Sequence, residues 1–231
     1  MSAFNIRTCA AVVAPVLAVS GVLITDSVAQ AASPAIVISE VYGGGGNSGA
    51  TLTNDFVELY NRSDAAMDVS GWVVQYYATT GGAGGLATLT GSVAPHHTYL
   101  VQMAAGTAGT TPLPTPYAIG TASMSAASGR VDLLQAGVVI DRVGYGASST
   151  AEGAAAPGLT NTTSATRNAP CVDTDDNATD FRATDPLPEN STVDKPACTV
   201  IPVFDEPETI EQIQGTSHVS PYRGKPVNGV L

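Results

Sequence analysis

The chain has 231 residues, of which 13% are charged, and its formal net charge is −11. Proteins that bind duplex DNA usually present a basic face that releases counterions from phosphates, and nine lysines and arginines scattered along this chain provide no such face. Direct binding of nucleic acid is therefore disfavoured. Abundant Gly, Ala, Ser and Thr with few charges are typical of an exported β domain rather than a disordered chain.

Residues 1–31 have the features of a signal peptide. Arg7 precedes an apolar run from Cys9 to Ile24, and Ala29-Gln30-Ala31 supplies the small residues of a cleavage site. A spanning helix needs ~20 apolar residues, whereas this run is shorter and contains Pro15. We expect export and cleavage, which would make the mature protein secreted, extracellular or associated with the cell surface. A retained N-terminal anchor is the alternative.

From residue 35 onward, short β-forming runs alternate with turn residues, which predicts an all-β sandwich or barrel. The expected strands cover residues 35–42, 55–61, 72–77, 87–89, 98–103, 130–135 and 138–145. Two loops are expected to be mobile surface segments: residues 43–53, which contain four consecutive glycines, and residues 106–116, which are rich in Thr and Pro.

Three local patterns refine this prediction. Imperfect alternation over residues 55–61 predicts one buried face, so that Glu58 faces either solvent or a buried partner. Trp72 follows the turn Asp68-Val69-Ser70-Gly71 and is expected to anchor the core. Residues 131–135 and 138–141, joined by Ala136-Gly137, predict a hairpin.

After Tyr145 the alternation is lost, and the chain is expected to be an irregular segment that becomes acidic between residues 173 and 185. Several prolines between residues 186 and 207 then predict an extended linker, with a domain boundary near Cys198.

Cleavage of the signal peptide would leave Cys171 and Cys198 as the only cysteines, an even number in an oxidising compartment. We therefore expect them to form a disulfide. Closing a loop of this length would stabilise the fold by about 3 kcal/mol through the unfolded-state entropy. The alternative, a metal site, has no further Cys or His nearby.

Five segments, in this order, resemble the lamin tail domain of secreted bacterial proteins. They are Ile38-Ser39-Glu40-Val41-Tyr42, the run from Asn54 to Asn61, Asp68-Val69-Ser70-Gly71-Trp72, the hairpin end Asp141-Arg142-Val143-Gly144-Tyr145, and the run from Cys171 to Asn177. The resemblance covers residues 33–198 and implies an immunoglobulin-like β-sandwich.

A second resemblance begins after the predicted linker at residues 199–209. The run from Ile210 to Tyr222 is similar to the start of an OB-fold domain. In large secreted nucleases such a domain follows a lamin tail domain and precedes an endonuclease/exonuclease/phosphatase catalytic domain. Residues 210–231 are too few to close a five-stranded barrel and are expected to be a truncated start of that domain.

The acidic segment is a candidate calcium site because oxygen ligands are dense within it. The candidate ligands are Asp173, Asp175, Asp176, Asn177 and Asp180. The segment departs from an EF-hand loop, since Ala178 and Thr184 stand where Gly and Glu are needed. The alternative is a series of Asx turns that need no ion.

No pattern in the chain composes a catalytic site. Gly43–Gly46 lacks the Lys-Ser/Thr ending of a phosphate-binding loop. Neighbouring His96 and His97 should point in opposite directions, and His218 has no accompanying triad-like aspartate. We therefore expect this chain not to be an enzyme, and calcium is the one cofactor the sequence suggests.

These observations favour an exported, non-catalytic module that binds or positions an unknown protein or a cell-envelope component, accessory to an extracellular nuclease. One alternative is a truncated secreted nuclease whose catalytic domain lies beyond this chain. A second is a cell-surface structural protein that associates through strand edges.

Overall fold

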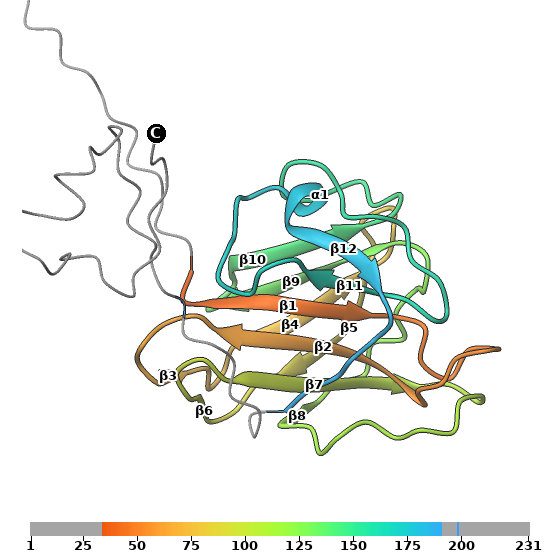
Figure 1. The fold of residues 1–231 in the computed structure, drawn as a ribbon, viewed down its shortest axis with the longest axis horizontal. Coiled ribbons are helices and arrows are strands. Elements are labelled where there is room, and N and C mark those ends of the chain that lie inside the picture. The colour runs from red at the N-terminus through yellow and green to blue at the C-terminus, as the bar shows by residue number, and fades with distance from the viewer. Residues whose placement is uncertain (1–33, 191–197, 199–231) are drawn as a thin grey trace, which may run out of the picture. The chain divides into compact units, whose positions relative to one another are not determined.

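The computed structural model describes residues 34–190 and Cys198. The predicted signal peptide, the linker and the OB-fold-like segment lie outside the described residues. Within them, two β-sheets face each other across a hydrophobic core (Figure 1), as expected for an immunoglobulin-like sandwich. No helix of residues 34–190 is long and apolar enough to cross a membrane.

The larger sheet has six strands in the order β12-β11-β1-β2-β7-β8. All neighbours are antiparallel except β7 and β8. The bounds are β1 Ile36–Tyr42, β2 Asn54–Asn61, β7 Thr98–Ala105, β8 Ala118–Ile119, β11 Ser164–Arg167 and β12 Phe181–Thr184.

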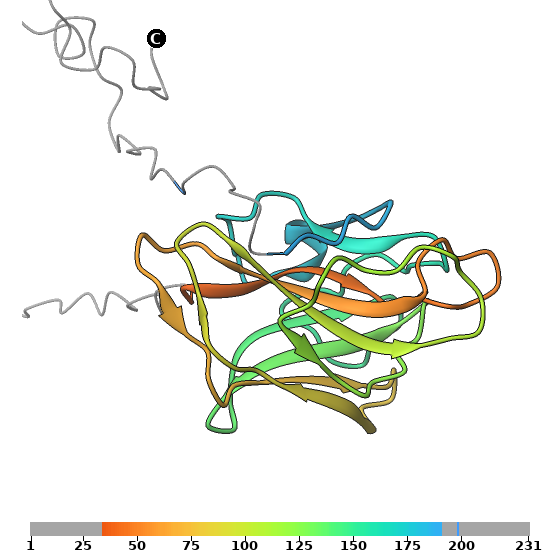
Figure 2. The same ribbon diagram turned by 90° about the horizontal axis from the view of Figure 1, so that it is seen from below.

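The smaller sheet has four antiparallel strands in the order β10-β9-β4-β5. Figure 2 shows the two sheets as stacked layers. The bounds are β4 Val73–Tyr77, β5 Ala83–Thr88, β9 Gly129–Gln135 and β10 Val138–Tyr145, with a separate pair β3 Met67–Asp68 and β6 Ser92–Val93, and a single helical turn α1 Asn177–Asp180.

The core forms because alternate residues of the facing strands are apolar and point inward. Ile38, Val57, Val74 and Leu133 are fully buried there, and burying each such side chain contributes roughly 1.5–3 kcal/mol. Trp72 lies in the same core with 6% of its surface exposed, which confirms its predicted role.

All seven predicted strands are present, with shifted ends. The largest shift is in β5, which begins at Ala83 because Ala83, Leu86 and Ala87 all pair with β4. The predicted hairpin is also confirmed: β9 and β10 pair across Ala136-Gly137, whose φ angles are +49° and +82°. Positive φ at both turn residues matches the right-handed twist of a two-residue hairpin.

The segment after Tyr145 is largely irregular, as predicted, but it also contains two short strands that the prediction missed. It adds β11 and β12 to the larger sheet, with β11 paired to β1 and β12 paired to β11. β11 reads Ser-Ala-Thr-Arg and lacks the apolar alternation of a half-buried strand. Its position is fixed instead by ladder hydrogen bonds and by a bond of 2.6 Å between the hydroxyls of Thr166 and Thr184.

The two loops expected to be mobile surface segments are packed against one another, which corrects that prediction as well. Gly43–Gly46 is buried, and a Cβ on Gly45 would lie 1.9 Å from the carbonyl carbon of Asn54. The N–H of Thr53 donates to the carbonyl of Thr111 at 3.0 Å. Glycine is needed here because the backbones approach too closely for any side chain.

Candidate functional site

The densest group of ionisable residues lies around Arg167, the last residue of β11. Its guanidinium is 1% exposed and contacts three carboxylates, those of Asp141, Asp173 and Asp180, each at 3.3 Å. It also lies 4.6 Å from the centre of the Phe181 ring. A buried guanidinium is stable only when its donors are paired, and here almost all of them are.

Arg167 and Asp141 bind the backbone of β1 where its ladder is interrupted. β1 shifts register against β2 between Ile38 and Glu40, and β11 pairs with β1 only at Glu40 and Val41. The N–H of Ile38 donates to Asp141 Oδ2 at 2.5 Å, and Arg167 Nε donates to the Ile38 carbonyl at 2.9 Å. The ion pair therefore replaces two strand hydrogen bonds at this sheet edge.

Negative charge exceeds positive charge in this cluster. Carboxylate oxygens of Asp141, Glu152 and Asp173 all lie within 4.8 Å of one another, and Arg62 approaches Asp173 at 3.8 Å. Among the described residues, these three carboxylates form the group that could hold a metal ion such as calcium, because hard cations prefer carboxylate oxygens.

The excess of carboxylates raises two pKa values. Burial raises the pKa of Asp141 to about 6, although the positive charge of Arg167 opposes the shift. Burial raises the pKa of Glu152 to about 8, with further increases from the charges of Asp141 and Asp173. Both carboxyls therefore bind a proton more tightly in the fold than in free solution, and a bound cation would oppose that shift.

The five residues predicted to bind calcium have different partners in the structure. Asp173 and Asp180 both pair with Arg167, and Asp180 also accepts the N–H and hydroxyl of Thr174. Asp176 caps α1 by accepting the Ala178 N–H at 3.1 Å. Asp175 is exposed with a φ of +54°. Calcium binding stays a prediction.

Asn177, the fifth of these residues, completes the free edge of β10. Its side chain is fully buried, accepts the N–H of Gly144 at 2.8 Å and donates to the carbonyl of Arg142 at 2.9 Å. It also accepts the N–H of Glu152 at 3.2 Å. The amide thus acts like one residue of an additional strand, which satisfies buried backbone groups at the sheet edge.

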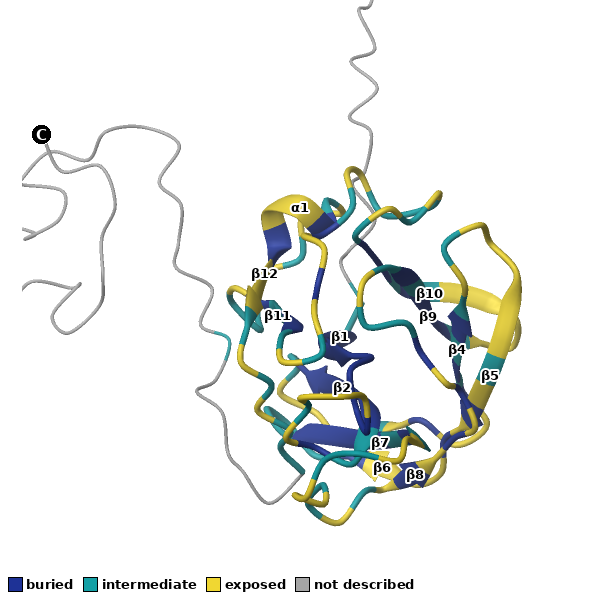
Figure 3. Ribbon diagram, turned by 90° about the vertical axis from the view of Figure 1, so that its right-hand side faces the viewer, coloured by how far each residue is buried: buried dark blue, intermediate teal, exposed yellow. Residues whose placement is uncertain are grey.

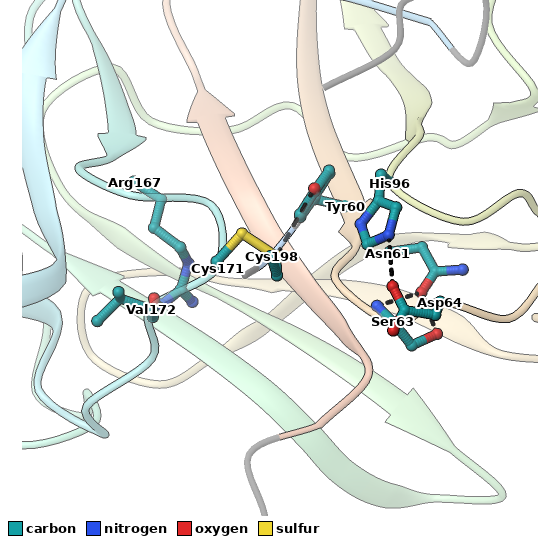
Figure 4. Close-up of a disulfide and its surroundings, with 9 residues drawn as sticks. All are labelled: Tyr60, Asn61, Ser63, Asp64, His96, Arg167, Cys171, Val172 and Cys198. Carbon is teal, nitrogen blue, oxygen red and sulfur yellow. Dashed lines mark hydrogen bonds and ion pairs between the residues drawn. A yellow bond between two sulfur atoms is a disulfide. The ribbon is translucent and has the colours of Figure 1, made fainter. Parts of the chain in front are cut away.

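The predicted disulfide is present. The sulfur atoms of Cys171 and Cys198 are bonded, with the Cα atoms 5.3 Å apart, and the bridge lies beside β1 and β2 (Figure 4). The Tyr60 hydroxyl lies 3.8 Å from the sulfur of Cys198. Cys171 lies four residues after Arg167, so the bridge and the ion cluster are neighbours.

With the sandwich and the ion cluster established, a comparison with known families is informative. The sequence profile described as Lamin Tail Domain matches residues 29–147, just over half of the chain. The chain belongs to the lamin tail domain family. No curated protein sequence matches it significantly. The matched residues include β1 to β10, while β11, α1, β12 and the two cysteines of the disulfide follow the match.

The ion cluster therefore joins two parts of this lamin tail domain. Asp141 lies within the matched residues, and Arg167, Asp173 and Asp180 come after them. The sequence could have indicated Asp141, because it stands on the inward row of β10 beside Leu133, where an apolar residue is expected. Nothing in the sequence places Glu152 or Arg167 beside it.

A second polar site lies on the outer face of the larger sheet of the lamin tail domain. Glu40 and Glu58 are direct cross-strand partners and both are buried. Glu40 accepts the N–H of Leu187 at 3.0 Å, and Glu58 accepts the N–H of Glu189 at 2.8 Å and the hydroxyl of Ser39 at 2.9 Å. Of the two positions left open for Glu58, the structure therefore shows the buried one.

These contacts place residues 187–189 across the sheet like a bound peptide. A cavity of about 90 Å³ lies between this segment and the sheet. It is lined mainly by polar side chains, including those of Thr98 and Thr166. Since like charges on opposed strands repel, the two backbone N–H groups stabilise a pair of carboxylates that would otherwise be unfavourable.

The histidines do not converge on one site. His96 Nε2 lies 2.8 Å from Asp64, and His97 Nδ1 lies 2.8 Å from the carbonyl of Pro95 (Figure 4 shows the first pair). His218 lies outside the described residues. The glycines at 43–46 surround no open cradle, because the N–H of Gly45 is bound by Asp55.

Proposed function

We propose that this lamin tail domain is an exported, non-catalytic module that binds or positions a partner outside the cytoplasm, accessory to an extracellular nuclease. The observation that carries the proposal is the disulfide between Cys171 and Cys198. Such bonds persist in oxidising compartments, and cytosolic thiols are kept reduced. The signal-peptide features of residues 1–31 support the same location.

The arrangement of the ion cluster supports a structural role for its charged groups. Arg167 and Asp141 bind the backbone of Ile38, and Asn177 binds the backbone of β10. Side chains engaged in this way hold the two sheets in position and leave the loops and the outer face of the smaller sheet for a partner. Partners of the proposed module are an unknown protein or a cell-envelope component.

The nuclease context rests on the resemblance of the run from Ile210 to Tyr222 to the start of an OB-fold. In this proposal the domain places a catalytic domain near its substrate and takes no part in the chemistry.

Expression of the full chain in a bacterial host with an oxidising periplasm tests the exported state. Mass spectrometry of the exported fraction should find a mature N-terminus close to residue 32 and a peptide containing Cys171 linked to Cys198. A full chain that stays in the cytoplasm with both thiols free would contradict the proposal. A variant with the apolar run interrupted by Leu17→Arg is the matched control and should not be exported.

A further inference from the structure

The outer face of the four-stranded sheet carries rows of side chains that take no part in the ion cluster. Strand register places residues of β10, β9, β4 and β5 in rows across this face. The three rows are Val139-Leu134-Val73-Thr88, Arg142-Asp132-Gln75-Leu86 and Gly144-Arg130-Tyr77-Ala83. We call these three rows together the arginine face (Figure 3 shows the sheet that bears it).

Two arginines flank one aspartate on the arginine face. Arg142 donates to both oxygens of Asp132, at 2.8 and 2.9 Å, and Arg130 Nε lies 3.0 Å from the same carboxylate. Asp132 is 2% exposed between them. One carboxylate cannot neutralise two guanidiniums, so this trio has one surplus positive charge.

The surplus charge comes with unused hydrogen-bond donors. The guanidinium of Arg130 stacks 3.8 Å from the centre of the Tyr77 ring, and its Nε is buried without a hydrogen bond. Within residues 34–190 and Cys198, three guanidinium nitrogens donate to no protein acceptor. They are both Nη atoms of Arg130 and Nη1 of Arg142. Stacking on the ring fixes the direction of these donors before a partner arrives.

The surroundings of the two arginines resemble the centre of a protein interface. Tyr and Arg are enriched at such centres, and charged residues other than Arg are depleted there. On this face Leu86 is 42% exposed and Val139 39% exposed, while the side chains of Arg130 and Arg142 are 12% and 24% exposed. Aliphatic, aromatic and guanidinium groups therefore meet on one flat surface.

The remaining arginines of the described chain are engaged elsewhere. Arg167 is buried in the ion cluster, Arg62 approaches Asp173, and Arg182 donates to Asn168 on the edge strand β12. No lysine lies between residues 34 and 190, where acidic residues outnumber arginines. An acidic partner would therefore be repelled by most of the surface and attracted to the arginine face.

We propose that the arginine face binds an acidic segment of a partner protein, with carboxylates seated on Arg130 and Arg142 and aliphatic side chains packed on Val73, Leu86 and Leu134. This inference rests on the proposed binding function and names the surface and the partner chemistry. Duplex DNA fits the face poorly, because one surplus charge releases few counterions and the net charge of −11 repels the phosphate backbone.

Fluorescence anisotropy with a labelled ten-residue peptide of alternating Glu and Val tests the proposal on the mature, disulfide-bonded chain. We expect saturable binding that weakens with added salt, and no binding of the matching uncharged Gln-Val peptide. The double variant Arg130→Gln/Arg142→Gln should bind the Glu-Val peptide roughly tenfold more weakly. Arg182→Gln, which removes an exposed arginine from the other sheet, is the matched control and should bind normally.

The single variant Arg130→Gln guards against misfolding, because Arg142 still binds both oxygens of the buried Asp132 carboxylate when Arg130 is replaced. It should stay folded, with a Tm only slightly below that of the wild type, and still weaken binding. Absence of saturable Glu-Val binding, an equal loss in Arg182→Gln, or preferential binding of a short DNA duplex would overturn the proposal. Peptide binding that is unchanged in the Arg130 and Arg142 variants would overturn the assignment of the face but would not contradict the proposed binding function. DNA cleavage by the domain would reject the proposed function itself.

Discussion

Single side chains complete the backbone hydrogen bonding of this domain where the strand ladders end. Asp141 and Arg167 bind Ile38 of β1, and Asn177 binds Gly144 and Arg142 of β10. Unpaired backbone groups in a buried place are costly, so each of these residues contributes more than its own contacts suggest. They lie on three different elements: Asp141 on β10, Arg167 on β11 and Asn177 on α1.

Replacing Asn177 by Ala tests this role. The change leaves the Gly144 N–H and the Arg142 carbonyl without their partner in a buried position, and we expect a loss of about 1–3 kcal/mol in the free energy of unfolding. Urea denaturation measures the loss. Asn168→Ala removes an exposed amide that donates to Thr179, and this control should cost less than about 1 kcal/mol.

Among the elements, the segment from Pro186 to Asn190 depends on two backbone hydrogen bonds and one covalent bond. Leu187 is 68% exposed, so its side chain gives the segment little hydrophobic anchoring. The N–H groups of Leu187 and Glu189 bind Glu40 and Glu58, and the bridge to Cys198 closes the chain beside them. We therefore expect the disulfide to help hold this segment against the sheet.

The variant Cys171→Ser/Cys198→Ser should release the segment while leaving the sandwich folded. We expect a loss of about 3 kcal/mol in unfolding free energy. Hydrogen exchange at the Leu187 and Glu189 amides should become faster, and exchange in β2 and β9 should change only as far as the lower global stability requires. Unchanged exchange at both tail amides would show that the disulfide does not hold the segment. Glu58→Gln, with the disulfide intact, is the matched control. Its side-chain oxygen can still accept the Glu189 N–H, so exchange at the two tail amides should stay slow.

Elements built from apolar and β-branched runs could be predicted from the sequence, and those held by specific side chains could not. β1, β2, β9 and β10 are such runs, bounded by turn residues. β11 reads Ser-Ala-Thr-Arg, and only its pairing with β1 makes it a strand. Gly43–Gly46 suggested a mobile loop, yet the absence of side chains is what permits its close packing on β2.

The candidate site was predicted in part for the same reason. The disulfide followed from the number of cysteines and the expected compartment. Asp173 and Asp180 were recognised as acidic neighbours, but their shared partner Arg167 depends on how β11 pairs with β1. Long-range contacts of this kind carry no local pattern.

At the scale of the whole molecule, three carboxyls that are buried or half-buried make stability depend on pH. Burial raises the pKa of Asp55 from an ordinary value near 3.8 to about 7, that of Asp141 to about 6 and that of Glu152 to about 8. The folded state binds these protons more tightly than the unfolded state does. Their contribution is complete below about pH 4 and is lost as the pH rises through about 6 to 8.

The free energy of unfolding should therefore fall between about pH 5 and about pH 8, as measured by urea denaturation. Glu152→Gln keeps an acceptor for Asn177 and removes the titrating group, so its stability should depend less on pH near the upper end of this range. Stability that rises with pH over the whole interval would contradict the raised pKa values of these groups in the fold.

A bound calcium ion would favour the ionised carboxylates, whereas burial favours their protonated forms. Thermal melting at neutral pH distinguishes calcium binding from the Asx-turn interpretation of the acidic segment. An ion bound by Asp141, Glu152 and Asp173 should raise the Tm in proportion to its affinity, and a chelator should remove the increase. Glu152→Gln should lose this response while staying folded. A midpoint that is the same with calcium and with chelator would reject calcium binding and favour the Asx-turn interpretation.

The central claim is that this lamin tail domain binds or positions a partner and performs no chemistry on nucleic acid. A plasmid-nicking assay on the purified mature chain, with magnesium and calcium in turn, tests it most directly. We predict that supercoiled plasmid stays intact at protein concentrations that saturate peptide binding. Metal-dependent conversion of the plasmid to nicked or linear DNA, by an activity that copurifies with the folded chain, would contradict the claim. It would assign a nuclease activity to the domain itself.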